Sequence, residues 1–287
     1  MIAVLKHELS NYFHSLTAYI FGAFLLVFVG IGAMLYNIQS AVSNFEYVLD
    51  FVSLVLAVIV PIMTMRVIAE ERKQKTDQLL YALPITAVEV VVGKFLALLV
   101  VYMIPLLIIC VYPYMFSQYG EVYLLTSYGS ILAFFIMGAA LMAVGMFISS
   151  LTENQGFAAG IGVMAILLNY YSVTLTEYIS STAVGSAVVL CIFALLLGAV
   201  VYHLTRHENF AVAVSVILVL AVCGCYYVDS SMFEGLVPEI MAKLSLFERF
   251  NTFVSGVFDL SAITYFLTVI VFFLFLTVQS LEKRRYN

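Results

Sequence analysis

The chain has 287 residues, of which 64% are hydrophobic and 10% are charged, and its mean hydropathy is +1.11. An average soluble domain is about 45–50% apolar and about 25% charged, so this chain has too little polar surface to cover itself in water. The composition therefore excludes a cytosolic enzyme, a nucleic-acid-binding protein and a disordered tail, and it predicts an all-α integral membrane protein. The net charge of −5 is less informative than the positions of the charges.

Residues 1–16 are predicted to form an amphipathic helix at the membrane interface. Its apolar positions recur near helical spacing at Ile2, Leu5, Leu9, Tyr12 and Phe13. The other faces carry Lys6, His7, Glu8, Asn11 and His14. Such a helix serves either as a membrane anchor alone or as part of a functional surface. Because the segment lacks the order of a signal peptide, we expect the mature protein to begin at Met1.

The remaining residues, 17–287, are predicted to form a single transmembrane domain with about eight spans. A run of about 20 apolar residues makes a helix long enough to cross roughly 30 Å of hydrocarbon. The eight runs are Thr17–Asn37, Phe51–Ile68, Phe95–Phe116, Tyr128–Leu151, Gly156–Leu175, Ala183–Tyr202, Phe210–Val228 and Ala262–Leu281. The longest insert outside the membrane is the extracytoplasmic segment 229–261.

The lysines and arginines predict that both termini lie in the cytoplasm, because cytoplasmic flanks accumulate these residues. With the amino end inside, the inner side carries Lys6, Arg66, Arg72, Lys73, Lys75, Lys94, Arg206, Lys283, Arg284 and Arg285. The outer side carries only Lys243 and Arg249. The chain is therefore expected to be a multi-pass protein of a cell membrane.

The spans are almost free of ionisable side chains, and Arg66, close to an inner end, is the exception. The most polar cluster in a span contains Asn169 and Tyr170, which either join neighbouring helices through hydrogen bonds or line a transport path. Small residues between Gly138 and Gly145, together with Gly156, Gly160 and Gly162, would allow helices to pack closely.

No arrangement typical of catalysis or nucleotide binding is found. His203 and His207 are four residues apart, but no acidic partner completes a metal site. The pair Gly93-Lys94 is followed by Phe95 instead of the Ser or Thr of a phosphate-binding loop. We therefore expect no catalytic residue, metal or cofactor in this chain, and its energy source must lie elsewhere.

The inner loop 69–94 is the longest cytoplasmic connection and the most densely charged segment. Residues 70–78 contain no Gly or Pro, so the helix of the second span is predicted to continue beyond the membrane. An apolar ridge follows, and Pro84 ends the helix. Thr86 and Glu89 then have the spacing of a capping box, which predicts a new helix. The product is a helix-turn-helix elbow whose tip either docks a partner or packs on lipid.

Three parts of the chain carry a resemblance to a known family. The inner loop contributes Met65–Arg72, Thr76, Leu79, Leu80, Pro84, Gly93 and Lys94. The amino end contributes Glu8, Leu9, Tyr12, Phe13, Ser15 and Ala18–Ile20. The carboxyl end contributes Leu244, Ser245, Phe247, Phe250, Phe253, Gly256–Asp259, Leu276, Thr277 and Glu282–Arg285. In this order they resemble permease subunits of type-2 ABC exporters, with greatest similarity to the gliding-motility and copper-processing branch. The chain departs from this family in Leu16, where a proline is usual, and in having eight spans instead of six.

The resemblance implies a permease that works with a cytoplasmic ABC ATPase in two copies, which would bind ATP and Mg²⁺. A second permease copy or a related permease would complete the pore, with membrane lipid around it and an extracytoplasmic accessory subunit as a further partner. The membrane would be the plasma membrane of a prokaryotic cell. In place of the six-span core alone, this chain would carry an extra pair of helices near 183–228.

By the same resemblance, the motion of the ATPase is passed to the spans by the amino-terminal interfacial helix and by the elbow 69–94. The residues predicted to take part are Glu70, Glu71, Arg72, Thr76, Leu79, Leu80, Leu83 and Pro84. The segment 232–259 would form short re-entrant or surface helices at an outer gate. The alternatives are an ion-coupled carrier or channel without an ATPase, which the scarcity of ionisable groups in the spans disfavours, and a membrane scaffold without transport.

Overall fold

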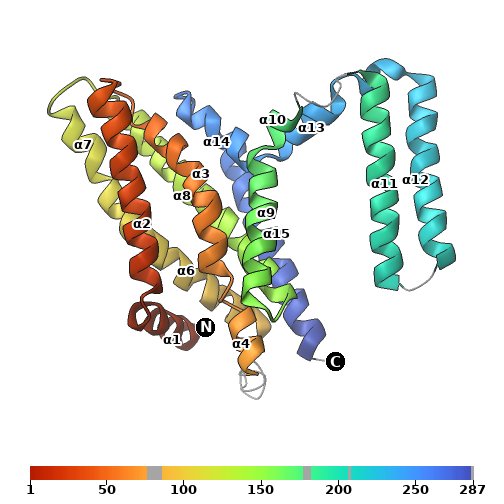
Figure 1. Cartoon of the computed structure of the whole chain (residues 1–287), viewed down its shortest axis with the longest axis horizontal. Coiled ribbons are helices and arrows are strands. Elements are labelled where there is room, and N and C mark those ends of the chain that lie inside the picture. Colours follow the sequence, from red (N-terminus) through yellow and green to blue (C-terminus); the bar gives the residue numbers. More distant parts are fainter. Residues whose placement is uncertain (76–85, 177–181, 206–207, 286–287) are drawn as a thin grey trace. The chain divides into compact units, whose positions relative to one another are not determined.

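Figure 1 shows the computed structural model of the chain, which describes residues 1–75, 86–176, 182–205 and 208–285. The described residues form helices and connecting turns, without strands, as the sequence predicts. They fall into two compact units, of which unit 1 comprises Met1–Tyr170 with Arg249–Asn287 and unit 2 comprises Tyr171–Glu248. The predicted coupling residues Thr76, Leu79, Leu80, Leu83 and Pro84 lie outside the described residues.

Unit 1 holds the helices that pack against one another through the largest buried apolar core. In chain order these are α1 (Ile2–His14), α2 (Thr17–Gly32), the π-helix η1 (Ala33–Gln39), α3 (Glu46–Thr64), α4 (Ala69–Gln74), α6 (Ala87–Ile109), α7 (Val111–Ser117), α8 (Leu124–Leu151), α9 (Gln155–Tyr170) and α15 (Leu260–Arg285). Short helix α14 (Leu246–Val254) begins in unit 2 and ends in unit 1. The core is formed mainly where α8 packs against α3 and α15.

Unit 2 contains α10 (Ser172–Thr176), α11 (Ala183–Thr205), α12 (Glu208–Val228), the 3-10 helix η2 (Ser230–Phe233) and α13 (Leu236–Leu244). Helices α11 and α12 lie side by side along their length. They correspond to the extra pair of apolar runs. In the segment 232–259, the structure has two short helices, α13 and α14, followed by Gly256 with φ +82°.

Five helical segments in the described residues are long and apolar enough to cross a membrane. They are Thr17–Gln39, Glu46–Gln74, Ala87–Ser117, Leu124–Leu151 and Leu260–Arg284. Helix α9 has 16 residues and is shorter than these, and α13 with part of α12 forms a pair of helices bent by 117° that would count as a sixth span. A multi-pass membrane protein is consistent with this set, and the count of eight spans stays a prediction.

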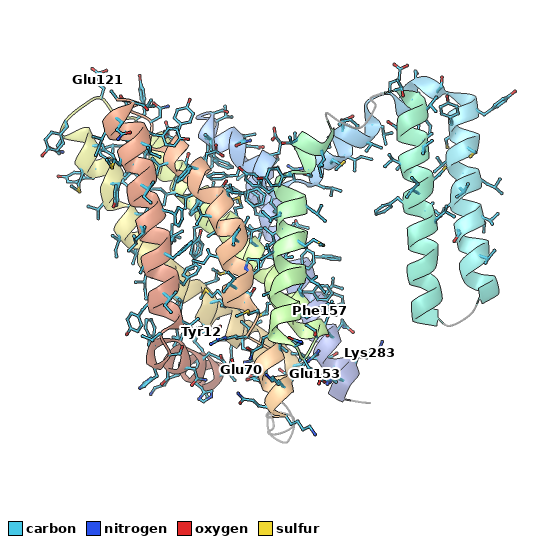
Figure 2. All side chains as sticks on the ribbon, in the orientation of Figure 1. Tyr12, Glu70, Glu121, Glu153, Phe157 and Lys283 are labelled. Atoms are coloured by element: carbon cyan, nitrogen blue, oxygen red, sulfur yellow. The ribbon has the colours of Figure 1, made fainter. Side chains whose placement is uncertain are left out.

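The two ends of unit 1 differ in their charge. Helices α1 and α4 lie at one end, together with the C-terminal end of α15 (Figure 1), and we call this the α1–α4 end. Tyr12, Glu70, Glu153 and Lys283 are found there, whereas Glu121 lies at the opposite end (Figure 2). Most of the lysines and arginines assigned from sequence to the inner side belong to elements of the α1–α4 end.

Two glycines of α8 allow it to approach its neighbours closely. A Cβ atom at Gly145 would lie 2.1 Å from Oγ1 of Thr64 in α3. One at Gly138 would lie 2.5 Å from the ring of Tyr102 in α6. The side chain of Tyr102 is fully buried and its hydroxyl donates to the carbonyl oxygen of Phe134 at 3.0 Å. Of the glycines that the sequence suggested for close packing, Gly160 has open space around it.

We expect Gly145→Ala to destabilise the protein, because neither α3 nor α8 can move aside without disturbing a packed core. Overpacking of this kind typically costs about 1–3 kcal/mol. Thermal unfolding in detergent, followed by far-ultraviolet circular dichroism, should show a lower midpoint. Gly160→Ala is the matched control and should leave the midpoint unchanged or raise it, because alanine favours a helix over glycine. Equal midpoints for Gly145→Ala and the natural protein would contradict the close contact.

Candidate coupling site

The helical segment of the second span reaches the elbow, but with an interruption that the sequence did not predict. Helix α3 ends at Thr64, turns follow over residues 65–68, and α4 is a separate helix that ends at Gln74. Lys75 ends it in the left-handed conformation, with φ 58° and ψ 20°. Of residues 70–78, which contain no Gly or Pro, residues 70–74 are helical, Lys75 ends the helix, and residues 76–78 lie outside the described residues.

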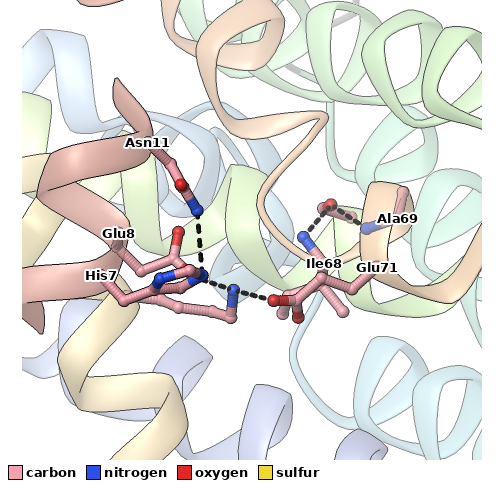
Figure 3. A network of polar contacts seen from close by, with 8 residues as sticks. His7, Glu8, Asn11, Ile68, Ala69 and Glu71 are labelled. Atoms are coloured by element: carbon pink, nitrogen blue, oxygen red, sulfur yellow. Dashed lines mark hydrogen bonds and ion pairs between the residues drawn. The ribbon is translucent and has the colours of Figure 1, made fainter. Parts of the chain in front are cut away.

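Ser149 of α8 compensates for the break between α3 and α4. Its hydroxyl oxygen accepts hydrogen bonds from the backbone N–H groups of Ile68, at 3.2 Å, and Ala69, at 3.1 Å (Figure 3). The same hydroxyl donates to the carbonyl oxygen of Met65 at 3.0 Å. Buried backbone groups at a helix end need such partners, so this side chain fixes where α4 starts.

Lys94 of α6 forms the central ion pair of the α1–α4 end. Its Nζ atom lies 2.6 Å from Oε1 of Glu8 in α1 and 2.7 Å from Oε1 of Glu71 in α4. The lysine side chain is 2% exposed, and those of the two glutamates are 10% and 26% exposed. One buried cation therefore holds carboxylates from two elements that are far apart in the sequence, as the positions of Glu8 and Glu71 in Figure 3 indicate.

Helix α1 lies against α6 on a face that the sequence pattern did not identify. Glu8 and Tyr12 are its buried residues, whereas Ile2 is 74% exposed. The sequence placed Glu8 among the polar positions outside the apolar face, and the structure buries it against Lys94. Burial and the nearby carboxylates of Glu8, Glu71 and Glu70, in that order, raise the pKa of Tyr12, so its phenol stays neutral.

Gly93 makes this contact possible. A Cβ atom at this position would lie 3.1 Å from the side chain of Val4 and 3.3 Å from the carbonyl oxygen of Met1. The pair Gly93-Lys94 thus combines a close approach of α1 with a cation for its glutamate. At the start of the same helix, Thr86 and Glu89 form the predicted capping box, with both reciprocal hydrogen bonds, so this prediction is confirmed.

Arg72 connects α4 to a third element. The residue is buried, and its Nη2 atom donates to Oγ of Ser280 in α15 at 3.5 Å. Ser280 in turn donates to the carbonyl oxygen of Ser150 at 3.1 Å. Nearby in the sequence, Arg284 forms an ion pair with Glu153 in the turn between α8 and α9. Polar contacts therefore join α4 to α6, α8 and α15.

The structure brings part of the predicted site together. Glu71 and Arg72 lie in α4 with side chains that contact Lys94 and Ser280, and Oε1 of Glu70 accepts a hydrogen bond from Gln74 at 3.3 Å. Asn169 and Tyr170 are half-buried at the C-terminal end of α9. This helix starts at the α1–α4 end, where Phe157 is found (Figure 2), and Asn169 is about 18 Å further along it at 1.5 Å per residue.

Glu8, Lys94 and Ser149 are functional candidates that reasoning from sequence missed. Lys94 was noticed only as part of a motif, and Ser149 was not singled out. The sequence did contain one signal for Glu8: it lies one helical turn before Tyr12, so the two side chains share a face of α1. The arrangement contains no nucleophile next to a base, and within the described residues no group of three or more His, Cys, Asp or Glu side chains could hold a metal. What it provides is a rigid polar junction between helices.

Residues 33–172 match the family described as ABC-2 family transporter protein. This match supports an ABC-2 type permease, and such permeases are normally non-catalytic membrane subunits of a transporter with an ATPase partner. It covers just under half of the chain and includes α3, α4, α6, α8 and α9, and therefore Glu71, Lys94 and Ser149. No curated protein and no solved structure matches the chain.

We expect Ser149→Ala to destabilise unit 1, because two buried N–H groups and one carbonyl would lose their partner. An unsatisfied buried polar group costs about 1–3 kcal/mol. The midpoint of thermal unfolding in detergent should fall. The matched control is Ser117→Ala, whose hydroxyl donates only to the carbonyl of Tyr114 on an exposed helix end. A fall for Ser117→Ala as large as for Ser149→Ala would contradict this role of Ser149.

Proposed function

We propose that this chain is the membrane-spanning permease subunit of an ABC exporter, driven by ATP that a separate cytoplasmic ATPase hydrolyses. The observation that carries the proposal is the match of residues 33–172 to ABC-2 family transporters. The long apolar helices of unit 1 are consistent with it. So is the junction of α1, α4 and α6, because a permease without its own catalytic site needs a route by which an external motor can move its helices.

In this proposal the α1–α4 end faces the cytoplasm. Its lysines and arginines follow the bias of cytoplasmic flanks. The N-terminus and the C-terminal end of α15 both lie there (Figure 1). The chain would have eight spans in the plasma membrane of a prokaryote and would belong nearest the gliding-motility and copper-processing branch. Two permeases, identical or related, would each bind one copy of the ATPase, which holds ATP and Mg²⁺, and an extracytoplasmic subunit would complete the assembly.

We place the ATPase contact on the elbow. Lys73, Gln74 and Lys75 are exposed at the end of α4. The residues that follow them include the apolar Leu79, Leu80 and Leu83, with Thr76 before them and Pro84 after them. These would enter the ATPase as an apolar plug, with Glu70 beside them. Glu71 and Arg72 would connect the elbow to the spans, since their side chains contact Lys94 of α6 and Ser280 of α15.

Asn169 and Tyr170 would contribute to the transport path at the other end of unit 1. They are half-buried and lie on the helix whose Gly162 packs against Pro61 of α3. An almost uncharged lining would suit an amphipathic or lipid-like cargo. Their distance from α4 means that a change at Asn169 would affect transport without weakening the hold on the ATPase.

The test is affinity purification of the tagged protein from its native membrane, with identification of the chains that accompany it. We expect a P-loop ATPase to be recovered with the natural sequence and to be lost with Leu80→Asp, because a carboxylate cannot enter an apolar pocket without a large desolvation cost. Glu121→Gln, at the opposite end of unit 1, is the control and should retain the ATPase.

Two results would contradict the proposal. One is a preparation that lacks an ATPase and transports substrate in liposomes under an ion gradient, which would favour the ion-coupled carrier. The other is an ATPase that is retained equally by Leu80→Asp and the natural protein, which would remove the coupling role from the elbow.

A further inference from the structure

We infer that Lys94 is a positioning residue that joins α4 to α1, so that α1 moves together with the elbow when the ATPase moves it. The inference rests on the proposed function. It assigns to Lys94 the contact through which the amino-terminal helix takes part in the coupling. The observation behind it is that one buried lysine forms ion pairs with both Glu8 and Glu71.

The two helices that Lys94 joins pack on different neighbours. Helix α1 contacts mainly α6 and α2, whereas α4 contacts α8 and α9. Without Lys94, a displacement of α4 would reach α1 through the packed spans and through the nearness of the Glu71 carboxylate to Tyr12. With Lys94, the same displacement acts on a side chain that is 2.6 Å from a carboxylate of α1. The link is therefore direct and electrostatic.

The burial of Lys94 makes the link stiff. A buried cation is strongly destabilised when a carboxylate partner leaves it, because neither water nor a mobile ion replaces the lost interaction. Movement of α4 away from α6 would leave Lys94 with Glu8 alone, at 2% exposure. The favourable course is that α4, Lys94 and α1 keep their contacts and shift as one body.

The rest of α1 is suited to a moving part at a membrane surface. Its buried face packs on Gly93, where the absence of a side chain leaves room for Val4. Ile2 and Phe13 are exposed on it, and so are Lys6, His7 and His14. Such a helix can slide along the interface while lipid covers its apolar positions.

Two single substitutions test the two ion pairs of Lys94 separately. Glu8→Gln weakens the contact between Lys94 and α1, and Glu71→Gln weakens the contact between Lys94 and α4. Each keeps an oxygen that can accept a hydrogen bond from Lys94 and leaves one carboxylate to neutralise the lysine, so the fold should be retained. Lys6→Gln is the matched control on α1, because Lys6 is exposed.

The experiment measures distances between spin labels in the complex of the permease with its ATPase, reconstituted in lipid nanodiscs. The native cysteines, replaced by serine beforehand, are Cys110, Cys191, Cys223 and Cys225. One label pair joins α1 to α8 through Ala3→Cys and Leu132→Cys, and a second joins α4 to α8 through Lys73→Cys and the same reference. All three positions are exposed. Distances are compared without nucleotide and after trapping with ATP and vanadate.

We expect both distances to shift on trapping in the natural sequence and in Lys6→Gln. In Glu8→Gln the α4 shift should persist while the α1 shift is lost, and Glu71→Gln should have the same effect. A merely structural role of Lys94 would lower the unfolding midpoint without separating the two shifts. If Glu8→Gln does not fold, Glu8→Asp replaces it, because the charge is kept while the reach to Lys94 is shortened.

The outcomes distinguish this inference from the proposed function. If no ATPase binds the natural protein, or if α4 does not shift on trapping, the proposed function fails. If the ATPase binds and α4 shifts, but α1 stays still or moves equally in Glu8→Gln, the inference about Lys94 is wrong while the proposed function stands.

Discussion

The burial of Lys94 is the interaction on which the α1–α4 end of this protein depends. In a chain with only 10% charged residues, a lysine at 2% exposure can be accommodated only if carboxylates are brought to it. This requirement determines where α1 lies, because Glu8 must face α6, and it determines the rotation of α4, because Glu71 must face the same point. Once α4 is oriented in this way, Arg72 turns toward α15 and Lys73 toward the exterior.

The break between α3 and α4 allows α4 to be oriented separately from α3, so that Glu71 can face Lys94. A continuous helix would run from α3 into α4, whereas turns at residues 65–68 interrupt it. The interrupted backbone is stabilised by a single hydroxyl, that of Ser149, on the helix that also comes closest to α3 at Gly145. The position of α4 therefore depends on α8 for its backbone hydrogen bonds and on α6 for the partner of its charge.

Sequence reasoning succeeded where a local pattern determines the structure. The apolar runs are helices, even where they contain Pro61 or Pro105, because a helix satisfies the backbone groups of an apolar segment from within. The capping box at Thr86 formed because its partner is three residues away. It failed at Glu8, whose partner is 86 residues away and whose hydropathy assigned it to the wrong face. It also failed at Lys75, where a residue other than glycine adopts a positive φ and ends the helix. At Glu8 the deciding contact is tertiary, and at both positions the residue type alone favours another outcome.

The limits of the family match and of the compact units agree with each other. The match ends at residue 172, and unit 2 begins at Tyr171. Unit 1 holds α2, α3, α6, α8, α9 and α15, which is the number of spans expected for the six-span core, although α9 is shorter than the other five. Helices α11 and α12 belong to unit 2 and pack on each other. Every residue of the junction around Lys94 belongs to unit 1, so the predicted extra pair of spans lies in the other unit and does not contribute to that junction.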